Sequence, residues 1–332
     1  MKAILHTQYG PADELQLKEV PQPVPKENEV LIKIHATTVT SSDCNVRNFT
    51  FTPKLFLLPM RMQLGFPKPK TNILGIELAG KIETVGVQVK RFKVGELVFG
   101  TPDITMGAHA EYICLPEDGV LTDKPANLTH EEAATIPLAG NTALYFIRDV
   151  GNIKAGDRIL IHGASGGIGS FAVQLAKYYG AEVTAVCSTT NVEMVKSIGA
   201  DIVIDYTKED FAQIGERYDV IFDVVGKTSF SHSKNSLEEK GLYMTTLPTM
   251  AIILQSISTS MRAGKKVKFG DAVPKIDNLI FLKELAEAGE LKPVVDRTYP
   301  LEQMAEAFKY VEAGHKKGNV VIKVVQNEAG GA

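Results

Sequence analysis

The chain has 332 residues, of which 44% are hydrophobic and 23% are charged; this balance is typical of a globular protein and excludes a disordered or membrane-embedded chain. Such a length is comfortable for two domains, each with its own core. The formal net charge of -3 at pH 7 gives no overall attraction to a phosphate backbone, so nucleic acid is not an expected partner.

The first part of the chain is rich in short β-branched runs that glycine and proline interrupt. Examples of these runs are EVLIKIHATTV, GIELAGKIETVG and GELVFGTP. The sequence therefore predicts a mainly β domain over residues 1–122.

From residue 123 onward, strand and helix patterns alternate along the chain. The predicted strands are RILIHG, AEVTAVC, DIVIDY and YDVIFDVVG, and the helical stretches between them include SFAVQLAKYYG and NVEMVKSIG. Strands that are almost continuously apolar and alternate with helices predict a parallel sheet covered on both faces. We expect this second domain over residues 123–289.

The end of the chain returns to the texture of its beginning. Two predicted helices, KIDNLIFLKELAEAG and LEQMAEAFKYVEAG, are followed by a last strand, NVVIKVV. We therefore expect residues 290–332 to complete the first domain.

A turn of small residues follows the first strand of the second domain, in RILIHGASGGIGSFAVQLAKYYG. Gly166 and Gly167 let the backbone pass close to a pyrophosphate, and Gly169 lets helix and strand pack closely. The N-terminus of the following helix offers unpaired N–H groups to the anion. The turn predicts a dinucleotide-phosphate site, with Ala164 in place of the first glycine of the usual fingerprint. A sharp strand-to-helix turn without a ligand is the alternative.

The next strand ends in AVCSTTN, about 20 residues beyond the turn, where an Asp or Glu would bind the adenosine ribose of NAD. This stretch has no acid. A carboxylate would repel a 2′-phosphate, whereas Ser188, Thr190 and Asn191 offer neutral donors. Tyr206, after the following strand, adds a phenolic donor. We therefore predict NADPH as the cofactor; a site that does not select between cofactors is the alternative, because no Arg or Lys stands within the stretch.

Several segments carry a resemblance to a known family: GIELAG, PLAGNTALY, GDRILIHGASGGIGSFAVQLAKYYGAEV, GADIVIDY and GNVVIKV. They are similar to the medium-chain dehydrogenase/reductase superfamily, in its zinc-independent quinone oxidoreductase branch, over essentially the whole chain. The resemblance implies an α/β fold with a Rossmann doubly wound parallel sheet domain plus a mainly β GroES-like catalytic domain. It also implies a homodimer made by edge strands. Lys265, Lys266 and Lys268 mark either part of that seam or a solvated edge.

The resemblance also bears on metal binding. Zinc alcohol dehydrogenases carry a His directly before the Glu of GIELAG, and Ile76 stands at that position. A Cys ligand would lie near Thr40, and the cysteine-rich lobe has no counterpart. Because zinc needs nitrogen, sulfur or carboxylate ligands that converge, we expect no metal; a site built from Cys44 and a distant His is the alternative. Glu77 is expected to be structural.

The segment VTSSDCNVRN lies beside the nicotinamide in the family, which implies that Thr40, Asp43, Asn45 and Arg47 belong to the catalytic site. An alternative is that Asp43 and Arg47 pair with each other or only hold the loop. Thr142, at a helix start in the family, either touches the cofactor or packs the hinge. The expected cofactor residues are Thr142, Ala164, Ser165, Gly166, Gly167, Ile168, Gly169, Ser188, Thr190, Asn191, Tyr206, Val225 and Asn319.

The expected reaction is hydride transfer from NADPH to a quinone or an α,β-unsaturated carbonyl compound. Without zinc, hydrogen-bond donors must meet the charge that develops on the acceptor oxygen. Two alternatives are an enoyl-thioester reductase and a non-catalytic NADPH-binding protein with a structural or sensing role. Residues 50–75 form either a mobile flap over the substrate or a satellite core.

The chain is expected in the cytoplasm, without a membrane partner. Its three cysteines, Cys44, Cys114 and Cys187, are far apart in the sequence and form no C-x-x-C pair, which fits a reducing compartment. Its start lacks the pattern of a secretory signal.

Overall fold

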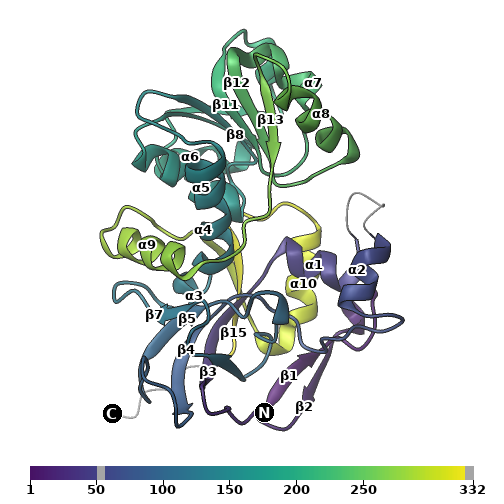
Figure 1. Cartoon of the computed structure of the whole chain (residues 1–332), viewed down its shortest axis with the longest axis vertical. Helices are drawn as coiled ribbons and strands as arrows, with labels where there is room; N and C mark the ends of the chain where they lie inside the picture. Colours follow the sequence, from purple (N-terminus) through teal and green to yellow (C-terminus); the bar gives the residue numbers. More distant parts are fainter. Residues whose placement is uncertain (51–56, 326–332) are drawn as a thin grey trace. The chain divides into compact units, whose positions relative to one another are not determined.

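The computed structural model describes residues 1–50 and 57–325, which form two compact units (Figure 1). Unit 1 comprises Met1–Leu138, Pro274–Ala288 and the described residues from Pro293 onward, and unit 2 comprises Ala139–Val273 and Gly289–Lys292. The division falls later than residue 122 because strand β7 (Leu121–Asp123) pairs with β5 (Leu97–Gly100) of unit 1. Helix α9 (Ile276–Glu287) joins unit 1 because it contacts β7.

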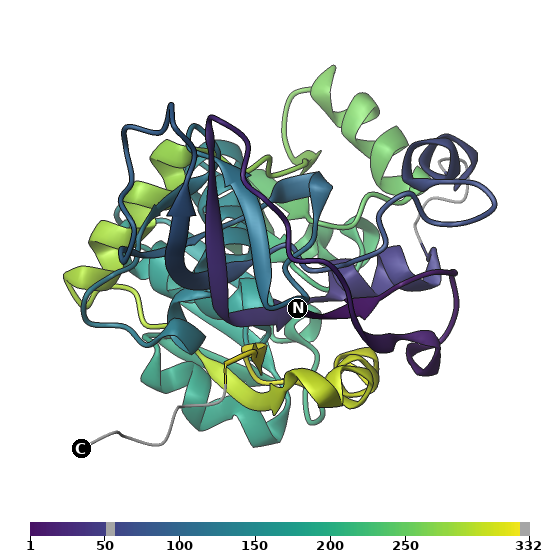
Figure 2. The ribbon, with the colours of Figure 1, turned by 90° about the horizontal axis from the view of Figure 1, so that it is seen from below.

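Unit 1 is built on a seven-stranded sheet with the order β14-β15-β3-β4-β5-β7, in which β6 also pairs with β3. The last strand, β15, runs antiparallel to β3, so the end of the chain completes the first domain. A separate hairpin joins β1 and β2 near the N-terminus (Figure 2). The further strands of the unit are β1 (Lys2–Leu5), β2 (Gln16–Glu19), β3 (Glu29–Val39), β4 (Leu78–Val85), β6 (Tyr112–Pro116), β14 (Val295–Pro300) and β15 (Asn319–Lys323).

Helices cover this sheet and close its core. Helix α10 packs Phe308 and Val311 into a cluster with Ile4 and Ile322, which joins the two ends of the chain. A second cluster lies between β3, β4 and β5, around Ile32 and Val98. Besides α9, the helices that begin in unit 1 are α1 (Ser41–Asn48), α2 (Leu57–Leu64), α3 (His130–Ala133), α4 (Ile136–Leu144) and α10 (Met304–Glu312), with short turns η1 (Ala12–Glu14), η3 (Asp103–Thr105) and η8 (Leu301–Gln303).

Unit 2 is a six-stranded sheet with the order β10-β9-β8-β11-β12-β13, and every pairing in it is parallel. Together with the β sheet of unit 1, it confirms the predicted combination of a Rossmann domain and a mainly β GroES-like domain. The strands are β8 (Arg158–His162), β9 (Glu182–Cys187), β10 (Ile202–Asp205), β11 (Tyr218–Asp223), β12 (Leu237–Thr245) and β13 (Lys266–Phe269).

The strands of unit 2 are apolar on both faces because helices flank the sheet. Helix α5 buries Phe171, Val173 and Leu175 against it. The helical elements of unit 2 are η4 (Tyr145–Val150), α5 (Gly167–Tyr178), η5 (Thr189–Asn191), α6 (Val192–Ser197), η6 (Phe211–Gln213), α7 (Phe230–Ser233), η7 (Lys234–Ser236) and α8 (Met250–Ser260). Among the described residues, no helix is long and apolar enough to cross a membrane.

The part of residues 50–75 that the structure describes is attached to unit 1; residues 51–56 of the expected flap lie outside the described residues. Arg61, on α2, lies over the rings of Tyr9 and Phe49, with its guanidinium carbon 4.3 and 4.6 Å from their centroids. The Tyr9 hydroxyl also donates a hydrogen bond to the Gly65 carbonyl at 3.1 Å. These cation–π and hydrogen-bond contacts hold α2 against the unit.

Two stacked histidines make the stability of unit 1 sensitive to acid. The rings of His35 and His130 stack with centroids 4.3 Å apart. Burial lowers the pKa of both, that of His130 to about 4, and the buried His130 Nε2 has no hydrogen-bond partner. The surrounding charges partly cancel: Lys33, Lys81 and Lys124 disfavour protonation, whereas Glu83 and Glu131 favour it.

Because these pKa values are depressed, the unfolded chain binds more protons than the folded chain as the pH falls from about 6.5 toward 4. Stability is therefore lost across that window, and His130→Gln should reduce the loss at pH 5 by about 1–2 kcal/mol. Melting temperatures measured from about pH 7.5 to about pH 5 test this. The control is His315→Gln, at an exposed position. Equal acid sensitivity in the parent and both variants would contradict it.

Candidate cofactor and active site

The glycine-rich turn lies where the strand order of unit 2 reverses, because β8 is flanked by β9 on one side and β11 on the other. Gly163 leaves β8 with a φ of +86°, a conformation that favours glycine. Gly166 is the N-cap of α5 and makes no side-chain capping bond. The first N–H groups of the helix therefore lack a capping side chain and can receive an anion.

Gly169 is required by the packing of this turn. A Cβ added there would lie 2.2 Å from the Gly163 carbonyl oxygen and 2.8 Å from the Ala164 Cα. At Gly166, by contrast, the nearest atom to an added Cβ is the same oxygen at 3.5 Å. The sequence pattern identified Gly169, but it did not single out Gly163, whose positive φ makes the turn.

The neutral donors at the end of β9 lie beside the turn. Asn191 is buried, and its Nδ2 donates a hydrogen bond to Ser165 Oγ at 2.9 Å. Ser188 Oγ and Thr190 Oγ1 are 3.4 Å apart. Tyr206, with 55% of its surface exposed, follows β10 at the same edge of the sheet. The structure thus brings together most of the predicted adenosine side of the site.

A carboxylate that sequence reasoning missed lies next to these donors. Asp205, the last residue of β10, accepts hydrogen bonds from Thr189 Oγ1 at 2.6 Å and Thr207 Oγ1 at 2.7 Å. Lys208 forms an ion pair with it at 3.1 Å. The hydrogen bond from Thr189 and these further contacts hold the Asp205 pKa well below its usual range. Its negative charge is thus balanced within its own loop.

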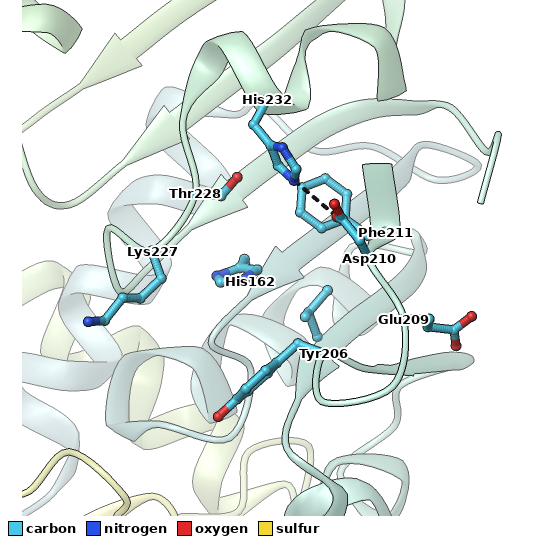
Figure 3. Close-up of a pocket in the computed structure, with 9 residues that line it drawn as sticks. His162, Tyr206, Glu209, Asp210, Phe211, Lys227, Thr228 and His232 are labelled. Atoms are coloured by element: carbon cyan, nitrogen blue, oxygen red, sulfur yellow. Dashed lines mark hydrogen bonds and ion pairs between the residues drawn. The ribbon is translucent and has the colours of Figure 1, made fainter. Parts of the chain in front are cut away.

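A pocket of about 120 Å³ opens at these strand ends (Figure 3). Figure 3 shows Lys227 and Tyr206 on one side of it and Asp210 on the other. His232 Nε2 and Asp210 Oδ1 are 3.0 Å apart and join the loop after β10 to α7. The full lining is His162, Val186, Tyr206, Glu209, Asp210, Phe211, Lys227, Thr228 and His232.

Two pocket residues have unused polar groups. His162 ends β8, and its buried Nδ1 has no hydrogen-bond partner; the nearest carboxylate oxygen, on Asp223, is 3.6 Å away, too far for a hydrogen bond. Lys227 is exposed, and its ammonium group forms no ion pair or hydrogen bond with another described residue. Sequence reasoning missed both, because the end of β8 and the loop after β11 meet only through the order of the sheet.

The loop after β11 is fixed by Asp223. Its carboxylate accepts hydrogen bonds from the N–H groups of Val225 at 3.1 Å, Gly226 at 2.9 Å and Thr228 at 3.2 Å. Val225, a predicted cofactor residue, is 38% exposed at this edge. These bonds hold the pocket-lining loop in place.

The remaining predicted cofactor residues differ in setting. Ala164 is fully buried behind the turn, and Ile168 and Thr142 are half-buried on α5 and α4 of unit 2. Asn319 belongs to unit 1 and is 4% exposed, and its Nδ2 donates to the Val294 carbonyl at 3.3 Å.

In unit 1, Thr40 and Asp43 form the capping box of α1. The Asp43 carboxylate accepts hydrogen bonds from the Thr40 N–H at 2.9 Å and hydroxyl at 2.6 Å, and from the Gly75 N–H at 3.2 Å. Asp43 is fully buried, so it orders the loop instead of facing a substrate. Asn45 is half-buried, and its Oδ1 accepts a hydrogen bond from Thr50 at 3.2 Å.

Arg47 does not pair with Asp43. Its NH1 donates to the Gly10 carbonyl at 2.6 Å, and its NH2 forms an ion pair with Glu312 at the end of α10. Its guanidinium carbon lies 5.2 Å from the centre of the Phe308 ring. Because the side chain is only 1% exposed, it offers no face to a substrate. In place of the expected catalytic contact we therefore propose a structural role, in which Arg47 joins α1 to α10.

Glu77 is also structural. It is fully buried and accepts hydrogen bonds from Thr38 Oγ1 at 2.6 Å and the Leu138 N–H at 2.7 Å. Sequence reasoning missed Lys316, whose pKa is lowered by burial against the opposing effect of the Glu77 charge.

Within residues 1–50 and 57–325, no group of three or more His, Cys, Asp or Glu residues is placed to hold a metal ion. Burial also raises the pKa of Cys44 to about 12, which disfavours the thiolate that zinc requires.

Comparison with known proteins places this geometry in context. Residues 26–126 match the family model of the alcohol dehydrogenase GroES-like domain, and residues 198–322 match that of zinc-binding dehydrogenases. A mitochondrial NAD(P)H oxidoreductase of Mus musculus is 34% identical over 90% of this chain and 82% of its own length. The chloroplastic NADPH-dependent alkenal/one oxidoreductase of Arabidopsis thaliana is 33% identical over 97% and 79%. The solved quinone oxidoreductase of Coxiella burnetii superposes with a TM-score of 0.86, at 29% identity over 98% and 99% of the two chains.

Proposed function

Because the chain is an oxidoreductase of the medium-chain dehydrogenase/reductase superfamily, in its quinone oxidoreductase-like branch, we propose that it transfers hydride from NADPH to a quinone or an α,β-unsaturated carbonyl compound without zinc. One observation carries this proposal: the uncapped N-terminus of α5 lies beside a neutral set of donors at the end of β9. The names of the alkenal/one and quinone oxidoreductases among its relatives support the acceptor class.

Each part of the site has a role in this reaction. When bound, the nicotinamide supplies the hydride, and the N–H groups at Gly166 and Gly167 hold the pyrophosphate. Ser188, Asn191 and Tyr206 hold the adenosine end. Lys227 supplies the positive charge that the AVCSTTN stretch lacks, because its ammonium group has no partner among the described residues and Lys227 lines the same pocket as Tyr206. Thr40 and Asn45 remain the proposed catalytic-site residues of unit 1.

The acceptor oxygen gains negative charge as hydride arrives, and hydrogen-bond donors must stabilise it. Because neither zinc nor a positioned acid polarises a simple ketone, the acceptor must delocalise the charge through its own conjugation. A steady-state panel with NADPH and NADH tests this, with a small quinone, an enone, an enoyl thioester and a primary alcohol. Quinone and enone should react at least about 100-fold faster than the alcohol is oxidised.

The other outcomes of this panel identify the alternatives. Fast reduction of the enoyl thioester alone would favour the enoyl-thioester reductase. Tight NADPH binding with no turnover of any acceptor would favour a structural or sensor protein. Robust alcohol oxidation with inert quinone and enone would show that the proposed reaction is wrong.

Ser188→Asp should reverse or abolish the preference for NADPH. A carboxylate at this position lies against the 2′-phosphate, and repulsion of about 3 kcal/mol should lower kcat/KM for NADPH about 100-fold while changing that for NADH less than about threefold. Ser188→Asn is the matched control, since it has a similar size without the charge. Equal efficiency of the parent with both cofactors, or an equal loss with both in Ser188→Asp, would contradict the cofactor assignment.

We also propose a cytoplasmic homodimer, which acts on a small-molecule quinone or enone. Light scattering should give twice the chain mass of 36.1 kDa, and a mass of one chain would overturn this. The three lysines at β13, which mark either part of the dimer seam or a solvated edge, each donate to a backbone carbonyl: Lys265 to Lys234, Lys266 to Thr259, and Lys268 to Val150. Location is tested by cell fractionation, since the similar mouse and Arabidopsis proteins are named mitochondrial and chloroplastic.

A further inference from the structure

Helix α8 carries its apolar residues on the outside. Met250, Leu254 and Ile257 are 42, 62 and 58% exposed, and Met261, directly after the helix, is 85% exposed. Their spacing of four, three and four residues places them on one face. We call these four residues the α8 stripe. The opposite face, which packs inward, has one buried apolar residue, Ile252, and half-buried polar residues such as Gln255 and Thr259.

The stripe belongs to a helix that is firmly held. Thr249 caps its N-terminus by accepting a hydrogen bond from the Ile252 N–H at 3.2 Å. Near its C-terminus, Thr259 Oγ1 accepts one from the Val267 N–H at 3.1 Å, and Lys266 Nζ donates to the Thr259 carbonyl at 2.7 Å. Helix α8 therefore lies against the edge strand β13 (Figure 1). A second copy cannot pair with the Val267 N–H unless Thr259 releases it.

Along the chain, the stripe begins close to the cofactor edge of unit 2. Leu247, 39% exposed, lies between the end of β12 and the start of α8. An added Cβ on Gly226 would be 2.8 Å from Leu247 Cδ1, and one on Gly163 would be 2.7 Å from Val225 Cγ1. Leu247 therefore lies beside the loop that carries Val225, Val225 lies beside the glycine turn, and Leu247 precedes the first residue of α8 by three positions.

The lack of charged residues also limits which kind of partner could cover this face. Residues 241–261 contain no Asp, Glu, Lys or Arg. A helix that lies on a membrane surface is usually rich in Lys and Arg on its polar face, and a solvated helix face is usually charged. An uncharged apolar face next to the cofactor edge is suited to bind an apolar part of the acceptor that reacts with the cofactor.

We infer that the α8 stripe and Leu247 bind the apolar tail of the acceptor, so that the preferred acceptors are quinones or enones with a long alkyl or prenyl chain. This inference rests on the proposed function, because the reacting group of the acceptor must lie at the C-terminal edge of the sheet, where the cofactor binds. From Met250 to Met261 the stripe extends about 16 Å, which is enough to accept a long chain along one side.

The test is a homologous series of unsaturated aldehydes, from crotonaldehyde through hexenal and octenal to decenal, with saturating NADPH. For the parent, kcat/KM should rise about twofold per methylene group, less than the roughly fourfold expected for full burial, because the stripe covers one side of the chain. The double variant Leu254→Ser, Ile257→Ser should lower the decenal-to-crotonaldehyde ratio of kcat/KM about tenfold. Val87→Ser, at a position 89% exposed on unit 1, is the control and should leave the ratio unchanged.

A binding measurement separates failure of this inference from failure of the proposed function. Calorimetric titration with a saturated long-chain ketone needs no turnover, and it should show binding to the parent that is at least about tenfold weaker in the double variant. If no aldehyde is reduced but the ketone binds in this way, the proposed reaction fails and the tail site stands. A ratio and a ketone affinity that the double variant leaves unchanged would overturn the inference. Loss of the dimer mass in light scattering, or of binding to phosphatidylcholine vesicles, would then identify a subunit seam or a membrane contact instead.

Discussion

Gly169→Ala is expected to abolish cofactor binding and to lower the melting temperature by about 10 °C. Its Cβ would lie 2.2 Å from the Gly163 carbonyl oxygen and 2.8 Å from the Ala164 Cα, and both are backbone atoms that no side-chain rotation can move. Helix α5 must therefore shift away from the turn, at a cost of about 3 kcal/mol or more. That shift also displaces the N–H groups that we propose hold the pyrophosphate.

Gly166→Ala is the matched control, because it adds the same methyl group to the same turn. Its φ of -81° suits any residue, and its Cβ would have 3.5 Å to the nearest atom. The fold should therefore be unaffected, with a melting temperature within about 2 °C of the parent. Cofactor affinity should still fall about tenfold, because the methyl group occupies space that the pyrophosphate approaches. Thermal scanning and calorimetric titration with NADPH measure both, and parent-like cofactor binding by Gly169→Ala would refute this model of the turn.

The glycine turn also shows what the sequence alone predicts well. The strand, turn and helix lie within one local stretch, and their apolar periodicity is strong, so the Rossmann domain and Gly169 could be inferred from residue order. Asp205 and Lys227 could not, because one ends β10 and the other lies on the loop after β11, and their position relative to the end of β9 depends on the order β10-β9-β8-β11. An acid or a lysine near a strand end is common, and only the fold shows that the charge of Asp205 is balanced and that Lys227 has no ion-pair partner within residues 1–50 and 57–325.

In unit 1 the sequence was a weaker guide for a similar reason. The family resemblance singled out the segment that contains α1, but it did not predict which of its side chains point inward. Arg47 turns toward Glu312, which follows it by 265 residues, and no local pattern signals that partner. Asp43, in contrast, could have been identified from the T-x-x-D spacing of a capping box, in which Asp takes the place of the usual Glu.

Arg47→Ala is expected to destabilise unit 1 by about 3 kcal/mol, close to the lower end of values for breaking a buried ion pair. Glu312 is 30% exposed and therefore keeps part of its hydration, whereas the guanidinium is 1% exposed. The variant also removes the side-chain donor of the Gly10 carbonyl and opens a void beside Phe308. Arg47→Lys should recover only part of the loss, because an ammonium cannot reproduce the two-sided contact of the guanidinium.

The readout that separates a structural from a catalytic role is turnover of the folded fraction. With thermal unfolding as the measure of stability, Arg47→Ala should melt about 6–12 °C below the parent, and Arg217→Ala, at an exposed position, should melt within about 2 °C of it. Well below the melting transition, kcat of Arg47→Ala with a small quinone should stay within about threefold of the parent, since Arg47 acts only by joining α1 to α10. A parent-like melting temperature together with a loss in kcat of about 100-fold or more would instead show that the guanidinium reaches the reacting acceptor.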